Sequence, residues 1–439
     1  MTGSPVSPGS GVEVEPAVRR RLHYGWVVVG ASVLLLAGFL GTTLCFGLFV
    51  KPLEAQFGWS RAATSGVMSL CIGVQGAVGI LMGRFTDKYN MGYVVAIGTV
   101  AGTAAYVLLS RVQSLWQFYL CFGLGAGICS GCAFSPVTAT VSKWFDHRRR
   151  TLAVAIALTG IMVGQTVLSP VMNRVISGGH WRTGYLVSAV IVFACGLPGV
   201  FLLARKPTPL ALHEGPAQAA PQSGAKTPVG PSGYSVREAA KTAPLWMIVI
   251  TAFTMAFGFY TIMSQIVAYA KEVSIAAGQA SLILTCVGLG SLVGGLLAGT
   301  FTTRWGGQRV LLVVFVAQAA AMFLFIATAS AWSFLVAALF YGLVYGAGSP
   351  TRMALIPQLF GMRCIGSLMG CTTFAWSVGG IVGPYVAGYI HDSTKGYALA
   401  FVICGLLLLV GSASVFFWGS HKKVAEAVTE TSKLGVVDE

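Results

Sequence analysis

Long apolar runs, separated by short polar or glycine-containing segments, follow one another along almost the whole chain. A helix that crosses a membrane needs about 20 mostly apolar residues, so each run near that length is expected to be a span. Twelve such runs are present. They fall at about residues 24–48, 62–83, 92–110, 115–140, 151–173, 183–204, 244–268, 279–301, 309–328, 332–356, 366–390 and 397–418. The pattern predicts an all-α membrane protein with twelve transmembrane helices.

Composition agrees with this pattern. Of the 439 residues, 55% are hydrophobic and only 9% are charged, whereas soluble domains carry about 25% charged residues. The net charge of +15 would suit a nucleic-acid partner if Lys and Arg were clustered on one face. Here they lie in the short segments between apolar runs, so we expect no nucleic-acid partner.

The placement of basic residues predicts the orientation in the membrane. With the N-terminus in the cytoplasm, 21 of the 28 Lys and Arg residues fall on the cytoplasmic side, as the positive-inside rule requires. An even number of spans puts the C-terminus on the same side. We therefore expect a multi-pass protein of the cell (inner) membrane, monomeric, with both termini cytoplasmic.

A polar segment divides the chain into two halves. Residues 205–243 are rich in Pro, Gly, Ala, Ser and Lys and lack apolar periodicity, which is typical of a linker. The predicted division is a cytoplasmic N-tail, a six-helix half, a cytoplasmic linker, a second six-helix half and a cytoplasmic C-tail. Their boundaries are 1–23, 24–204, 205–243, 244–418 and 419–439.

The two halves repeat each other weakly, as halves of membrane carriers do. After the second span comes Gly83-Arg-Phe-Thr-Asp87-Lys88, and after the eighth comes Gly299-Thr-Phe-Thr-Thr303-Arg304. Thr303 stands where the first copy has its acid. The repeat places a solute site where the two halves meet.

Four further stretches of the chain are distinctive: Tyr24-Gly-Trp-Val-Val28, Phe57-Gly-Trp-Ser-Arg-Ala62, Lys143-Trp-Phe145 with Arg148 to Arg150, and Gly383-Pro384 with Gly388. In these stretches the chain resembles the major facilitator superfamily, and within it the bacterial relatives of the monocarboxylate and oxalate/formate transporters. The resemblance implies the major facilitator fold and transport of a small solute by alternating access.

The resemblance also implies a conformational role for the repeated loops. In this family the carboxylate of the Gly-x-x-x-Asp-Arg/Lys loop holds helix ends of one half together in the outward-facing state. Gly83, Asp87 and Lys88 match that loop, and Arg304 belongs to its second copy. The plainer alternative is that Asp87 only completes a charged turn at a helix end.

Ionisable residues inside spans are costly and are by default functional candidates. All 13 acids lie in tails, loops or helix ends. Where the resembling carriers have an arginine in the eighth helix, this chain has Gly295, and residues 366–390 contain no basic residue. The remaining intramembrane charge is Arg352 in the tenth span. It would bind an anion in a cavity, or else extend to the cytoplasmic interface or cap a helix end.

Large polar side chains within spans are further candidates for a substrate cavity. With Arg352, the predicted substrate-binding residues are Tyr341, Tyr345, Tyr260, Gln265, Trp376, Thr373 and Gln165. For a single Thr the alternative is a hydrogen bond to its own preceding carbonyl. Cys129 and Cys132 form a CxxC motif that would suit a soft metal, but within a Gly- and Ala-rich span they are expected to be packing residues.

Nothing in the sequence resembles a catalytic constellation or a phosphate-binding loop, so we expect no enzyme and no cofactor. The first hypothesis is a secondary or facilitative carrier of a small organic acid such as a monocarboxylate, with or without a co-transported or exchanged ion. A carrier or exporter of a neutral or drug-like solute is the alternative. A membrane sensor or scaffold without transport is the alternative of another class.

Overall fold

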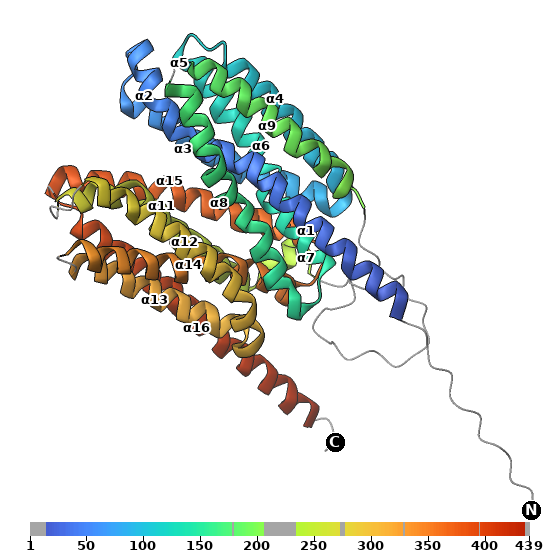
Figure 1. Cartoon of the computed structure of the whole chain (residues 1–439). Helices are drawn as coiled ribbons and strands as arrows, with labels where there is room; N and C mark the ends of the chain where they lie inside the picture. Colours follow the sequence, from blue (N-terminus) through green and yellow to red (C-terminus); the bar gives the residue numbers. More distant parts are fainter. Residues whose placement is uncertain are drawn as a thin grey trace, which may run out of the picture.

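The computed structural model describes residues 15–177, 180–205, 234–272, 277–327, 330–394 and 396–434, and in these ranges it is a helical bundle (Figure 1). The helices of the first part are α1 (Glu15–Leu44), α2 (Phe46–Phe57), α3 (Arg61–Lys88), α4 (Met91–Leu109), α5 (Leu115–Phe118), the π-helix η1 (Tyr119–Ala126), α6 (Gly127–Gly131), α7 (Phe134–Trp144), α8 (His147–Ser177) and α9 (Trp181–Leu202). Those of the second part are α10 (Val236–Ala240), α11 (Ala243–Glu272), α12 (Ala277–Trp305), α13 (Gly307–Ala327), α14 (Ala331–Phe360), α15 (Ile365–Thr394) and α16 (Ala398–Leu434).

Twelve segments of the described chain are long and apolar enough to cross a membrane, which confirms the predicted all-α membrane fold. Most helices extend beyond the apolar run that predicted them, and polar residues cap some of their ends. Ser60, for example, precedes α3 and its hydroxyl accepts a hydrogen bond from the backbone N–H of Ala63 at 3.2 Å. Most of the predicted linker and N-tail lies outside the described residues.

The fourth span, Leu115–Trp144, is not a regular helix. It passes from α5 through the π-helical turns of η1 into α6, and a break near Cys132 precedes α7. Wide π turns of this kind are frequent at functional sites. Apolar periodicity predicted the span but gave no sign of the irregularity, because a π turn changes backbone hydrogen bonding rather than composition.

The helices form two bundles, α1–α9 and α11–α16, referred to below as the N-terminal and C-terminal halves. The most extensive contacts between them are α3 beside α15 and α8 beside α12, and α8 also contacts α14 and α7 contacts α15. In Figure 1 the halves approach each other near the end where α1 begins and α16 ends, and their ribbons diverge toward the other end. We call the first of these the termini end.

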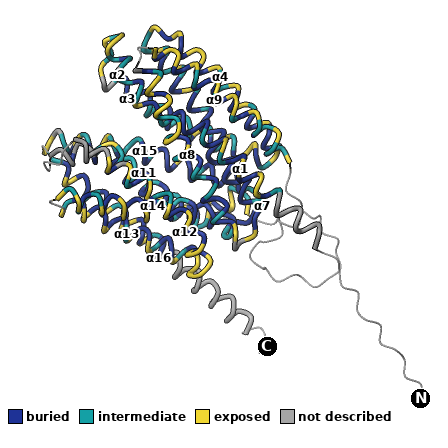
Figure 2. Tube along the Cα trace, in the orientation of Figure 1, coloured by how far each residue is buried: buried dark blue, intermediate teal, exposed yellow. Residues whose placement is uncertain are grey.

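Burial follows the expectation for a protein surrounded by lipid. The inner faces of both bundles are buried and their outer faces exposed (Figure 2). Large apolar side chains are common on the outer faces: Val100 of α4 is 70% exposed and Phe201 of α9 is 69% exposed. In water such surfaces would promote aggregation, whereas in a bilayer they face acyl chains.

Candidate functional site

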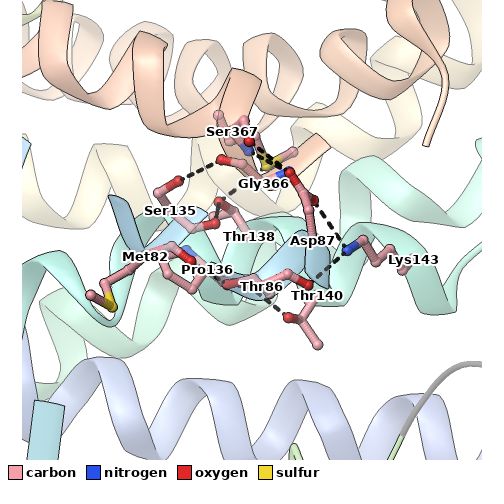
Figure 3. A network of polar contacts seen from close by, with 11 residues as sticks. Met82, Thr86, Asp87, Ser135, Pro136, Thr138, Thr140, Lys143, Gly366 and Ser367 are labelled. Atoms are coloured by element: carbon pink, nitrogen blue, oxygen red, sulfur yellow. Dashed lines mark hydrogen bonds and ion pairs between the residues drawn. The ribbon is translucent and has the colours of Figure 1, made fainter. Parts of the chain in front are cut away.

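Asp87, in the last turn of α3, binds the first turn of α15 (Figure 3). Its Oδ1 accepts a hydrogen bond from the backbone N–H of Gly366 at 2.9 Å. Its Oδ2 accepts two, from the backbone N–H and the hydroxyl of Ser367, both at 2.9 Å. The first N–H groups of a helix have no partner within it and carry the positive end of the helix dipole. A carboxylate from the N-terminal half therefore caps a helix of the C-terminal half.

Lys143 of α7 neutralises this carboxylate from within the N-terminal half. Its Nζ lies 3.5 Å from Asp87 Oδ1 and also donates to the carbonyl oxygen of Thr86 at 3.5 Å. The Lys143 and Asp87 side chains are only 14% and 8% exposed. Because water and salt screen a shielded pair weakly, this ion pair contributes more than a surface pair would.

Glycine allows the backbones of α3 and α15 to touch beside Asp87. A Cβ atom on Gly83 would collide with the carbonyl oxygen of Gly366, and one on Gly366 would collide with that of Gly83. Ser135 of α7 adds a hydrogen bond from its Oγ to the Gly366 carbonyl at 3.5 Å. We call Asp87, Lys143, Ser135, Gly366 and Ser367 the Asp87 network.

The sequence identified the centre of this network but not its partners. Gly83 and Asp87 lie in the contact, whereas the side chains of Lys88 and Arg304 are exposed. Lys143 pairs with Asp87 in place of the adjacent Lys88. The resemblance implied a contact within one half, and the structure adds contacts to the other half through Gly366 and Ser367.

The second copy of the loop is built differently. Thr303, which stands in place of the acid, donates a hydrogen bond to the carbonyl oxygen of Thr300 at 2.9 Å, within its own helix. Gly299 faces Leu152 of α8 so closely that a Cβ atom there would meet the Leu152 side chain and backbone. The α8–α12 contact is therefore a packing contact without the carboxylate of the first copy.

Arg352 of α14 is fully buried. Its Nε, Nη1 and Nη2 atoms have no hydrogen-bond partner among the described residues. The guanidinium carbon lies 5.5 Å from the centroid of the Trp376 ring on α15. The side chain thus does not extend to the surface, and a cation–π contact with Trp376 is the interaction that the structure gives it.

Aromatic rings from three helices gather next to this guanidinium. Phe259 and Tyr260 of α11 lie 6.3 and 6.4 Å from the Trp376 ring, and Tyr345 of α14 lies 6.3 Å from it. Phe259 and Tyr345 stack with centroids 4.2 Å apart. We call Phe259, Tyr260, Tyr345 and Trp376 the aromatic cluster. The sequence predicted three of them but missed Phe259, because a phenylalanine in a span carries no signal that separates it from a lipid-facing one.

Tyr341 lies next to this cluster and deeper in the C-terminal half. Its ring stacks 6.1 Å from that of Tyr345 and also contacts Phe325 of α13, with centroids 6.2 Å apart. The hydroxyl is buried and has no hydrogen-bond partner among the described residues. Tyr341 therefore forms the back of the cluster.

For the other predicted substrate-binding residues, the described structure gives no contact with Arg352 or the aromatic cluster. Thr373 is buried against Gly79 of α3, and its hydroxyl donates to the Met369 carbonyl at 2.8 Å. Gln265 of α11 is half-buried, and Gln165 is half-buried on α8 of the opposite half. The structure brings Arg352, Tyr345, Tyr260 and Trp376 together, with Tyr341 behind them.

The N-terminal half contains an uncharged polar cluster at a comparable depth. Tyr106 Oη donates to Thr42 Oγ1 at 3.4 Å and lies 3.3 Å from Thr43 Oγ1, which lies 3.2 Å from Ser130 Oγ. All four side chains are buried. We call this group the hydroxyl cluster, and its members satisfy one another without a charge.

The CxxC cysteines are buried free thiols that pack against glycines. Cys132 faces Gly98 and Cys129 faces Gly102, both on α4. In the described ranges no three His, Cys, Asp or Glu side chains lie where they could hold a metal ion together. The arrangement agrees with the packing role expected from sequence.

Mammalian monocarboxylate transporters resemble this chain over most of its length. Monocarboxylate transporter 13 of Rattus norvegicus is 26% identical over 394 residues, which are 89% of this chain and 87% of that protein. Monocarboxylate transporter 11 of Homo sapiens is 26% identical over 417 residues, 92% of this chain and 85% of that protein. Both comparisons cover nearly the whole chain.

Solved structures share the fold at lower sequence identity. The transporter FucP in its outward conformation superposes with a TM-score of 0.69 at 16% identity, covering 90% of this chain and 99% of that one. The human organic anion transporter MFSD10 gives 0.65 at 16% identity, covering 91% and 100%. The family model described as Major Facilitator Superfamily matches residues 30–274 and 248–435. The chain belongs to the major facilitator superfamily, and it is a multi-pass membrane transporter of that family.

Proposed function

We propose that the chain transports a small monocarboxylate and that Arg352 binds the substrate carboxylate. The observation that carries the proposal is the buried guanidinium whose three nitrogens have no partner among the described residues. A buried charge is costly unless it is paired, and Arg forms bidentate hydrogen bonds with carboxylates. A substrate anion would supply the missing partner. The names of the related monocarboxylate transporters support the same substrate class.

Under this proposal, Arg352 would provide an anion site without the arginine of the eighth helix. Gly295 stands there in this chain, and a Cβ atom on it would meet nothing closer than the Gly346 carbonyl of α14, at 3.5 Å. α12 and α14 pack side by side. The positive charge is thus carried by the neighbouring helix, two turns before its end at Phe360.

The Asp87 network would act as the gate on the cytoplasmic side. Its contacts join α3 and α7 to α15 near the termini end, so they exist only while the halves are closed there. Contacts present in one conformer and absent from the other bias the equilibrium between the two. With both termini cytoplasmic, as the distribution of Lys and Arg predicts, this conformer faces outward. Within this proposal the protein is a monomeric carrier of the cell membrane, not an enzyme, and it moves its solute with or without an ion.

The test is uptake by the purified chain in proteoliposomes of labelled lactate, pyruvate, oxalate and formate, with and without a pH gradient. We expect saturable lactate or pyruvate uptake that falls at least about 30-fold in Arg352→Gln, because a buried charge-assisted pair is worth about 2–5 kcal/mol. Arg309→Gln is the matched control, since Arg309 is exposed at the start of α13.

Two outcomes would contradict the proposal. If neither these acids nor any larger monocarboxylate is carried, the neutral or drug-like solute becomes the better hypothesis. If an acid is carried equally well by Arg352→Gln, the anion site lies elsewhere. Comparing uptake with and without the pH gradient then distinguishes proton symport from exchange or facilitated diffusion.

A further inference from the structure

The chemistry around Arg352 is more specific than a positive charge. The guanidinium contacts the Trp376 ring, and Phe259, Tyr260 and Tyr345 complete the aromatic cluster next to it. Phe259 and Tyr260 are the partly exposed members, while Tyr345 and Trp376 are 9% and 8% exposed. A substrate whose charged end reaches Arg352 would therefore have its body among these rings.

The contact with Trp376 leaves the guanidinium able to bind an anion. The N–H donors of a guanidinium point outward in its plane, whereas a ring interacts best with its face. All three nitrogens lack a protein acceptor among the described residues. A carboxylate approaching along the edge of the group could therefore accept two hydrogen bonds while Trp376 keeps its cation–π contact.

The charge balance of this region limits the substrate to one carboxylate. Arg352 is the one cationic side chain that the described structure places against the aromatic cluster. A second carboxylate on the same substrate would be buried against the negative faces of aromatic rings with no cation beside it. Oxalate and other short dicarboxylates are disfavoured on this ground.

The rings in turn favour a large, flat, apolar body on the substrate. An aromatic pair in an offset or edge-to-face arrangement is more favourable than simple burial of the same apolar area. A short aliphatic acid such as lactate makes none of these contacts. An aryl acid can make two, because Phe259 and Tyr260 are both partly exposed and belong to the same cluster of contacting rings.

We propose that the preferred substrate is a monocarboxylate with an aromatic or comparably bulky planar body, and that Trp376 is the main determinant of this preference. This inference rests on the proposed function, because it takes Arg352 as the carboxylate site. It goes further by naming the substrate class and the residue that selects it.

The test is uptake of four compounds by the full chain in proteoliposomes: lactate, 3-phenyllactate, phenylsuccinate and phenylacetamide. We expect uptake efficiency for 3-phenyllactate to exceed that for lactate by about 10-fold or more. Phenylsuccinate, which has a second carboxylate, and phenylacetamide, which has none, should both be poor substrates. Uptake of lactate in preference to 3-phenyllactate would overturn the inference.

Variants of Trp376 identify the source of the preference. Trp376→Leu should reduce the ratio of 3-phenyllactate to lactate uptake about 10-fold, and Trp376→Phe, which keeps a ring, should restore most of it. Trp332→Leu is the control, since Trp332 lies in the same helix as Arg352 but is 78% exposed. Because the readout is a ratio within one protein sample, a lower yield of folded protein does not change it.

The possible failures are distinguishable. If lactate uptake depends on Arg352 but shows no preference for the aryl acid, or if the ratio is unchanged in Trp376→Leu, the inference fails and the proposed function stands. If no carboxylate is carried, both fail.

Discussion

Two buried charged regions of this molecule differ in whether protein groups hydrogen-bond to the charge. In the Asp87 network the carboxylate has three hydrogen-bond donors from α15 of the C-terminal half and a lysine from α7 of the N-terminal half. In the C-terminal half, Arg352 is more deeply buried, yet no described residue accepts a hydrogen bond from it. A saturated charge holds two helices in one arrangement. An unsaturated buried charge costs more than a paired one, and under the proposed function its partner is the substrate.

The hydroxyl cluster of the N-terminal half sharpens this contrast. Thr42, Thr43, Tyr106 and Ser130 are as deeply buried as Arg352 but satisfy one another. Burial of polar groups in this fold therefore does not by itself indicate a ligand site. Arg352 differs from this cluster because it is charged and none of its nitrogens has a hydrogen-bond partner among the described residues.

The largest expected effect comes from forcing α3 and α15 apart beside the Asp87 network. Gly83→Val should reduce uptake about 100-fold, because its side chain would collide with the Gly366 carbonyl and overpacking costs about 1–3 kcal/mol. We would measure this effect by uptake. We would also measure the distance between spin labels at Tyr89 and Arg363, which lie on either side of the contact.

The control for Gly83→Val is Gly388→Ala on α15, where an added Cβ atom meets nothing within 4 Å. Gly366→Ala, on the same helix but in the contact, should behave like Gly83→Val. If the two α15 variants behaved alike, close backbone approach beside Asp87 would not matter for transport.

A smaller effect is expected from removing the carboxylate charge. Asp87→Asn loses the ion pair with Lys143 and weakens the cap on α15, a loss of about 2 kcal/mol that shifts the conformational equilibrium about 30-fold toward separation at the termini end. The same label pair should report a longer mean distance. An unchanged distance distribution would show that Asp87 merely completes a charged turn.

Removing the unpaired charge of Arg352, in contrast, is expected to cost no stability. Arg352→Met should leave the protein without ligand as stable as the parent or more stable by about 1 kcal/mol, because it replaces an unpaired buried charge with an apolar side chain of similar length. Thermal unfolding in detergent measures this change. Destabilisation by several kcal/mol would mean that Arg352 has a structural partner, which would break the comparison.

The smallest expected effect comes from the lysine that neutralises Asp87, for which Lys143 and Lys88 are the two candidates. Lys143→Gln should shift the conformational equilibrium about 5-fold, since it removes one shielded ion pair worth about 1 kcal/mol. Lys88→Gln should shift it less than about 2-fold, because Lys88 is exposed. The reverse order would restore to Lys88 the role that the family resemblance implies for it.

The sequence predicted the spans well because a bilayer imposes a simple requirement. Every helix that crosses it needs about 20 apolar residues, and that requirement can be counted along the chain. Irregularities such as the π-helical turns of η1 could not be counted in this way. They depend on how the glycine-rich fourth span packs against its neighbours.

In both charged regions the charged residue was predictable from sequence and its surroundings were not. Asp87 and Arg352 stood out because charge is rare in and beside spans. Their surroundings did not stand out, because Gly366 and Ser367 are separated from Asp87 by nearly 280 positions and only folding brings them together. Phe259 joins the aromatic cluster through a stacking contact of the same long-range kind with Tyr345.

The central claim, that Arg352 lacks a protein partner because its partner is the substrate, is tested most directly by ligand-dependent thermal unfolding of the purified chain. A bound ligand stabilises the folded state in proportion to the logarithm of its concentration above the dissociation constant. We predict that 3-phenyllactate or lactate raises the unfolding temperature of the parent and of Arg309→Gln but not of Arg352→Gln. An equal rise in Arg352→Gln would contradict the account.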